Sequence, residues 1–129
     1  MSPERALLFF TCGAHALTHL YMLLFTAVLK EMAADFGMDV ATFTKYAMIS
    51  TVLFGLGAVP AGWLGDRWGE KRLLIAFFVL TGTGGLLIGV AQGGKVLAAG
   101  MALMGAGTSI FHPVGNSLLA KGSPNLKRC

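Results

Sequence analysis

Three histidines are the side chains in this sequence best suited to carry a proton or bind a ligand. His15 and His19 are four residues apart, so on a helix both imidazoles project from the same face. His112 lies far along the chain, directly before Pro113. An imidazole changes charge near neutral pH, and its neutral form can ligate a metal. For the pair, the residues alone leave three roles open: hydrogen bonding between helices, contact with a solute or proton, and two ligands of a metal ion.

The segments that carry these histidines are unusually apolar. The chain has 129 residues, of which 55% are hydrophobic and only 12% charged, and its mean hydropathy is +0.70. This charged share is about half that of a soluble domain, which argues against a soluble globule and against a disordered chain. We therefore expect a lipid bilayer as partner. The net charge of +4 is spread between the apolar segments rather than gathered in one basic patch, so we expect no nucleic acid. Cys12 and Cys129 are expected to be unpaired thiols.

Four segments contain no Asp, Glu, Lys or Arg, namely 6–29, 46–65, 73–94 and 96–120. Each is long enough to cross a bilayer, which takes about 20 helical residues. We expect an all-α membrane protein with four antiparallel transmembrane helices over about 6–36, 40–65, 73–94 and 96–120. Gly37 should end the first helix and Asp39 should cap the second. Pro60 and Pro113 should kink the second and fourth helices.

Basic residues predict the orientation of these helices. With both termini on one side, that side holds Arg5, Arg67, Lys71, Arg72, Lys121, Lys127 and Arg128, and the other side holds Lys30, Lys45 and Lys95. Loops rich in Lys and Arg stay in the cytoplasm. We therefore expect a multi-pass protein of the cell (inner) membrane, with both termini and the connection at 66–72 on the cytoplasmic side.

Polar side chains in the first and fourth helices share a face with the histidines. At about 100° per residue, Thr11, Thr18 and Thr26 fall on the stripe that carries His15 and His19. The second such face holds Gly105, Thr108, Ser109, His112 and Asn116. Polar groups are costly against lipid, so both faces should line a cavity or contact a neighbouring helix. No Asp, Glu or Cys completes a metal site beside the histidine pair, so the sequence predicts no metal, no cofactor and no catalytic residue.

Glycines spaced four apart occur in the third predicted helix. Gly85, Gly89 and Gly93 have the GxxxG spacing typical of close helix packing in membranes, and few polar residues accompany them. We expect these glycines to form the packing face of that helix.

The stretch at 62–72, which ends the second predicted helix and forms the next connection, reads GWLGDRWGEKR. Its spacing alone also fits a basic loop with turn glycines. The stretch resembles the G-x-L-G/A-D-R-x-G-R-K/R signature of the major facilitator superfamily, although Glu70 stands where that family usually has Arg or Lys. The resemblance implies that Asp66 helps to hold the two halves of a transporter together. It also implies a conformational motif of Gly62, Gly65, Asp66, Arg67, Gly69, Lys71 and Arg72.

A second stretch resembles one particular branch of this family. Residues 105–113, GAGTSIFHP, resemble the G-x-G-S/T-S-x-F/Y-H-P segment of the fosmidomycin-resistance-like branch. That branch also has H-x-x-x-D in its first helix, followed by an aromatic residue; His15 and Tyr21 match, and His19 replaces the acid. The resemblance implies the first four helices of a twelve-helix transporter, in a single partial transmembrane domain over 1–129. The pathway residues are then expected to be His15, His19, Thr18, Tyr21, His112, Asn116 and Ser109.

These observations favour a secondary active transporter. It would move a small organic solute by alternating access and draw energy from an ion gradient, for which the histidines make a proton one candidate. The missing C-terminal helices or another chain would be its partner. Two alternatives remain: a complete four-helix exporter of the small multidrug type that works as an oligomer, and an inactive membrane fragment or interaction module. No set of nucleophile, base and acid occurs together, so we do not expect an enzyme.

Overall fold

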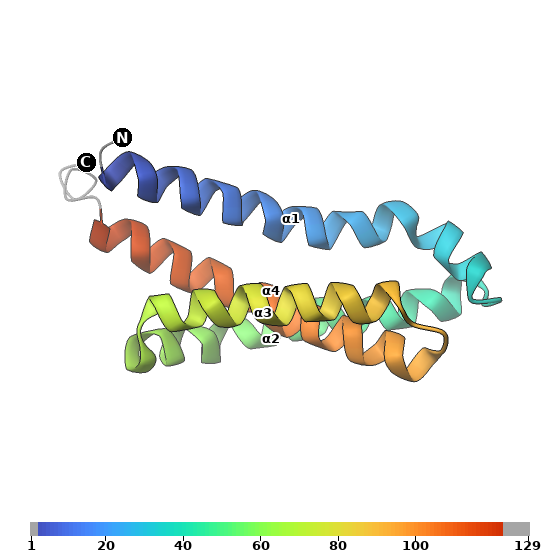
Figure 1. Cartoon of the computed structure of the whole chain (residues 1–129). Coiled ribbons are helices and arrows are strands. Elements are labelled where there is room, and N and C mark those ends of the chain that lie inside the picture. The colour runs from blue at the N-terminus through green and yellow to red at the C-terminus, as the bar shows by residue number, and fades with distance from the viewer. Residues whose placement is uncertain (1–2, 123–129) are drawn as a thin grey trace.

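The computed structural model describes residues 3–122, and four helices occupy nearly all of this range (Figure 1). Each helix is long and apolar enough to cross a membrane. The predicted all-α architecture is therefore confirmed, whereas Cys129 and two of the basic residues used for the orientation, Lys127 and Arg128, lie outside the described residues. In chain order the helices are α1 (Pro3–Asp35), α2 (Val40–Trp68), α3 (Glu70–Gly89) and α4 (Gly94–Gly122).

The turn between α1 and α2 follows the predicted signals. Gly37 has a φ of +61°, a left-handed conformation that ends α1. The N–H groups of Gly37 and Met38 donate back to carbonyls in the last turn of α1, at 3.0 and 2.9 Å. Asp39 then caps α2, because its Oδ1 accepts a hydrogen bond from the backbone N–H of Thr42 at 2.9 Å. The predicted N-cap is confirmed.

The connection between α2 and α3 is much shorter than the predicted loop at 66–72. α2 continues to Trp68 and α3 begins at Glu70, so only Gly69 lies outside a helix. Gly69 has a φ of +86°, a conformation that side chains disfavour, and its N–H still donates to the Gly65 carbonyl at 2.9 Å. One residue therefore reverses the chain. At its other end α3 stops at Gly89 rather than at 94, and Gly93, a residue of low helix propensity, directly precedes α4.

The helices run alternately up and down. The start of α1, the α2–α3 turn and the end of α4 lie at one end of the molecule, and the other two turns lie at the opposite end (Figure 1). α4 is the central helix, since it packs along both α2 and α3, while α1 makes fewer contacts with its neighbours. Both α2 and α4 continue as single helices past Pro60 and Pro113.

Buried apolar residues form two clusters that both depend on α4. Phe77, Phe111 and Val114 lie at the centre of the cluster nearer the α2–α3 turn, and Phe43, Leu97 and Met101 lie at the centre of the other. Large apolar side chains such as Phe9 and Val59 remain about 80% exposed on the outside. This distribution suits a protein whose outer surface contacts lipid rather than water.

Close approaches of α4 to both α2 and α3 require glycine. A Cβ on Gly84 would lie 2.8 Å from both the Gly100 carbonyl oxygen and the Met104 nitrogen, so α3 and α4 meet backbone to backbone here. A Cβ on Gly105 would lie 2.7 Å from the Ser50 Cα of α2. The predicted face of Gly85, Gly89 and Gly93 is wrong: Gly89 and Gly93 would meet no atom within 4 Å, and Gly85 would meet one Met104 methyl at 3.7 Å.

Candidate functional site

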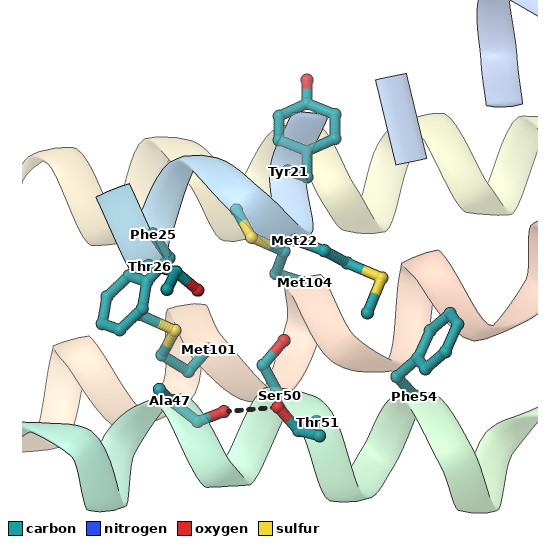
Figure 2. Close-up of a pocket in the computed structure, with 10 residues that line it drawn as sticks. All are labelled: Tyr21, Met22, Phe25, Thr26, Ala47, Ser50, Thr51, Phe54, Met101 and Met104. Carbon is teal, nitrogen blue, oxygen red and sulfur yellow. Dashed lines mark hydrogen bonds between the residues drawn. The ribbon is translucent and has the colours of Figure 1, made fainter. Parts of the chain in front are cut away.

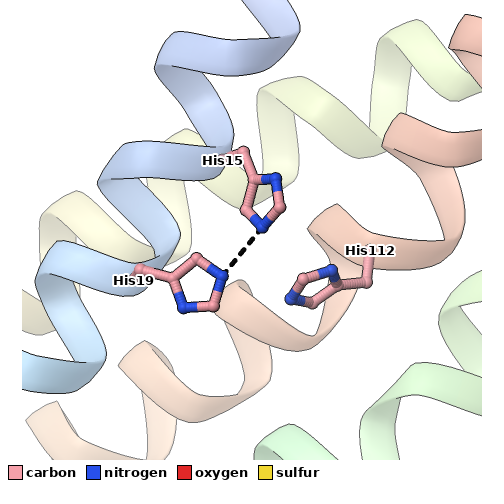
Figure 3. A group of neighbouring side chains, drawn as sticks. All are labelled: His15, His19 and His112. Carbon is pink, nitrogen blue, oxygen red and sulfur yellow. Dashed lines mark hydrogen bonds between the residues drawn. The ribbon is translucent and has the colours of Figure 1, made fainter.

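The three histidines of the chain meet between α1 and α4 (Figure 3). His15 Nε2 and His19 Nε2 are 2.8 Å apart and share a hydrogen bond. The ring of His112 points toward this pair, with centroid distances of 5.2 Å to His15 and 5.9 Å to His19. Ligand nitrogens of all three side chains lie within 4.8 Å of one another. Helix periodicity placed the first two histidines on one face, but only the packing of α4 on α1 adds the third.

The hydrogen bond within the pair restricts its protonation. One Nε2 must donate and the other must accept, so at least one of the two imidazoles has an unprotonated Nε2 while the bond persists. If both imidazoles were protonated, both Nε2 atoms would be donors, and the two cations would repel each other. Both imidazoles therefore cannot be fully protonated while the hydrogen bond persists.

Aromatic rings and a small cavity surround the histidines. Phe111 lies 5.7 Å from the His15 ring, and Phe54 of α2 lies 5.8 Å from the His112 ring. A cavity of about 60 Å³ extends between α1 and α4 along His15 and His112, and Asn116 lines it. The cavity is large enough for a few water molecules, and its polar side chains could bind them. Of the predicted pathway residues, Asn116 thus joins the histidines.

Thr18 and Ser109 use their hydroxyls within their own helices. Thr18 is fully buried and donates to the Ala14 carbonyl at 2.9 Å. Ser109 is also buried, and it donates to the Ala106 carbonyl at 2.7 Å. A Cβ on Gly57 would lie 2.8 Å from the Ser109 Cβ, so Ser109 sits at a close contact between α2 and α4. Hydroxyls that bond the preceding turn are satisfied without a ligand.

Tyr21 belongs to a neighbouring cavity of about 50 Å³ between α1, α2 and α4, and it lies at the edge of the group that lines it (Figure 2). This cavity includes side chains that the sequence analysis missed: Ser50, Thr51 and Phe54 of α2, and Met101 and Met104 of α4. Ser50 and Thr51 are consecutive polar residues within an apolar segment, which is the same signal that identified the polar faces of the first and fourth helices. Phe54 connects the two cavities, because its ring also contacts His112.

The 62–72 motif packs against the later part of α4. A Cβ on Gly62 would lie 3.6 Å from Pro113, and one on Gly65 would lie 3.5 Å from a Val114 methyl, so both glycines face α4. Arg67 stacks its guanidinium 4.8 Å from the centre of the Trp63 ring, a cation–π contact. Its neighbours Asp66, Lys71 and Arg72 are exposed. A cavity of about 180 Å³ lies beside Asp66 and Glu70.

Glu70, the departure from the family signature, ties α3 to α4. Its Oε1 forms an ion pair with Lys121 Nζ and accepts a hydrogen bond from Ser117 Oγ at 2.8 Å. Its side chain is 19% exposed, and it stands in the first turn of α3, where the helix dipole favours a negative charge. Glu70 therefore holds the start of α3 against α4. An Arg or Lys at this position would instead be repelled by Lys121.

Four antiparallel apolar helices of spanning length, with a polar cluster between two of them, define a multi-pass membrane protein. Residues 9–128 match the Major Facilitator Superfamily, and the chain belongs to this family. The match is to the superfamily as a whole, so the resemblance to the fosmidomycin-resistance-like branch stays a prediction.

One curated relative shows how much of a family member the chain represents. It is named "Probable 4-methylmuconolactone transporter", from Cupriavidus pinatubonensis (strain JMP 134 / LMG 1197), and it is 28% identical over 121 residues. The aligned region covers 93% of this chain but 28% of the relative, so the chain spans a little over a quarter of that protein's length. No solved structure matches the chain.

Proposed function

We propose that the chain is the N-terminal four-helix part of a twelve-helix secondary transporter, which moves a small organic solute by alternating access. Family membership and the relative named as a transporter support a role in transport. The alignment with about a quarter of the relative supports a partial unit. The observation that carries the proposal is the histidine cluster, because it joins polar groups of α1 and α4 inside an otherwise apolar bundle.

In this proposal α1 and α4 line the central path. His15, His19, His112 and Asn116 contact the solute or the coupling proton, and Tyr21 contacts the solute from the adjacent cavity. Energy comes from an ion gradient, since the sequence contains no nucleotide-binding P-loop. Protonation of both imidazoles of the His15–His19 pair would break their hydrogen bond, because neither Nε2 could then accept, and the two cations would repel each other. Because the His112 ring of α4 lies 5.2 Å from the His15 ring, the charge on the pair also acts on the contact between α1 and α4.

The 62–72 motif acts at the cytoplasmic side of the inner membrane in this proposal, where both termini also lie. Its exposed Asp66 contacts a helix of the C-terminal half in one conformation, and the Glu70–Lys121 pair keeps α3 and α4 together while the halves rock. The excess of basic residues at this end supports the orientation.

The test is uptake by membrane vesicles that contain the complete transporter. The relative's name makes 4-methylmuconolactone the first solute to try. His15→Ala and His112→Ala should each abolish solute movement driven by a pH gradient, while the amount of inserted protein stays the same. Gly55→Ala is the matched control, because Gly55 is exposed on α2 and a Cβ there meets nothing within 4 Å. Unchanged transport by both histidine variants would overturn the assignment.

Native mass measurement in mild detergent separates this proposal from the alternatives. A monomeric chain that transports nothing by itself supports the partial-unit proposal. A defined small homo-oligomer that transports by itself would instead identify the four-helix exporter. If the complete protein inserts into the membrane but moves no solute under any gradient, the result would favour the alternative of an inactive interaction module.

A further inference from the structure

The spacing of the three imidazoles is close to that of a metal site. In a tetrahedral zinc site with Zn–N bonds of about 2.0–2.1 Å, ligand nitrogens lie about 3.4 Å apart. His15 Nε2 and His19 Nε2 are 2.8 Å apart, and the nitrogens of the whole cluster lie within 4.8 Å. The pair would have to open by about 0.6 Å and His112 would have to approach by at most about 1.4 Å to reach this geometry. Rotations about side-chain bonds can supply movements of this size.

The sequence predicts no metal because no Asp, Glu or Cys accompanies the pair on α1 as a third ligand. The structure supplies that ligand as His112 of α4. Two histidines at i and i+4 present their rings on one side of α1, and the third approaches from the facing helix (Figure 3). This is a convergent arrangement from two elements rather than a chance pair on one helix.

The chemistry of the cluster selects a particular class of ion. Neutral imidazole suits Zn²⁺, Cu²⁺ and Ni²⁺, whereas Mg²⁺ and Ca²⁺ require oxygen ligands. Three protein ligands leave the fourth position of a tetrahedral ion open for water or an anion. In the described part of the chain the cluster contains no carboxylate or thiolate. An anionic fourth ligand such as hydroxide or chloride would therefore reduce the cost of placing a divalent ion here.

We propose that His15, His19 and His112 form a three-imidazole binding site for a divalent transition-metal ion, with one open coordination position. Such an ion links α1, which packs less extensively than the other helices, to the central helix α4. Binding would hold these two helices in the arrangement seen here. The proposal concerns the cluster itself and does not depend on the transport activity proposed above.

The experiment uses Co²⁺ as the probe, titrated into the 129-residue chain in detergent at neutral pH. Co²⁺ in a tetrahedral site with nitrogen ligands gives strong visible d–d absorption, and Zn²⁺ should displace it. His112→Ala removes one of the three ligands and leaves only the pair on α1. Loss of an outer-shell partner costs roughly 10- to 100-fold in metal affinity, so loss of a direct ligand should cost at least as much. His112→Gln should lose affinity in the same way while it keeps the size and polarity of the side chain.

Two further variants control for other ligands and for general damage to the helices. Cys12→Ser should bind as the unmodified chain does, because the exposed Cys12 lies near the cluster but is not one of its ligands. Ser117→Ala alters α4 without touching a ligand and should also retain affinity.

Equal affinity in the unmodified chain and both His112 variants would overturn the proposal, since the site would then be a two-histidine pair at most. Loss of binding in Cys12→Ser would overturn it as well, because a thiolate would be the ligand. Co²⁺ binding without the tetrahedral absorption, or no Co²⁺ binding at all, would also overturn the proposal. None of these results decides whether the complete protein transports a solute, which the uptake assay tests separately.

Discussion

The contact between Gly105 of α4 and Ser50 of α2 provides a quantitative test of the packing. A Cβ on Gly105 would lie 2.7 Å from the Ser50 Cα and 2.9 Å from its carbonyl carbon. Ordinary contacts begin at 3.4 Å, and the Ser50 carbonyl oxygen is nearer still than the Ser50 Cα, so the helices would have to separate by more than about 0.7 Å to admit the methyl group. The obstructing atoms are backbone, so no side-chain rotation can relieve the clash.

Gly105→Ala should therefore destabilise the chain by the roughly 1–3 kcal/mol that is typical of overpacking. Gly55→Ala is the control, because it is exposed on α2 and its Cβ meets nothing within 4 Å. That variant should gain up to about 1 kcal/mol from the better helix propensity of Ala. The two single-methyl variants should thus differ in free energy of unfolding by about 1–4 kcal/mol.

Unfolding can be measured by titrating SDS into mixed micelles and following helix content by circular dichroism. Trp63 and Trp68 provide a second signal, since both lie on α2, one of the two helices that should separate. Gly105→Ser, with a larger side chain, should be at least as destabilising as Gly105→Ala. If Gly105→Ala and Gly55→Ala unfold at the same SDS mole fraction, α2 and α4 do not approach each other as closely as described, and the reasoning fails.

Three further predictions concern the helix ends, each measured as the thermal midpoint of the chain in detergent. Glu70→Gln should lower the midpoint because it weakens the contacts to Lys121 and Ser117, and the loss should shrink in high salt. Gly69→Ala should destabilise by about 1–3 kcal/mol, because its φ of +86° strains any residue with a side chain. Hydrogen bonds from Thr42, first through its side chain and then through its backbone N–H, lower the pKa of Asp39 below the ordinary 3.8. The Asp39 carboxylate therefore stabilises the fold above that ordinary value, and the contribution is lost as the pH falls through the lowered pKa. Asp39→Ala should lack this part of the acid sensitivity.

Each of these predictions has a distinguishing result. Lys121→Met with no effect, beside a destabilising Ser117→Ala, would show that the hydrogen bond rather than the ion pair holds Glu70. A Gly69→Ala variant as stable as the unmodified chain would mean that the turn can adopt another backbone conformation. If Asp39→Ala and the unmodified chain lose stability in parallel below pH 4, other carboxylates account for the acid sensitivity.

The sequence alone determined that the chain is a set of four apolar helices and where several of them end. Lipid offers the backbone no hydrogen bonds, so a charge-free segment of spanning length has to be helical, and its length can be read directly. Local signals were sufficient at the first turn, where Gly37 adopts a left-handed conformation and Asp39 caps the next helix. They were insufficient at the second turn, because the number of residues needed to reverse the chain depends on how closely α2 and α3 pack.

Only the tertiary structure decided which residues meet between helices. Periodicity assigns a face to each residue of one helix, but it does not give the height or rotation of that helix relative to its neighbour. For this reason Gly84, rather than Gly85 or Gly89, meets the backbone of α4. For the same reason His112, which is remote in sequence, completes a cluster with His15 and His19. The packing of α1 on α4 sets the distance between His112 and the pair, and the spacing of residues within either helix does not predict it.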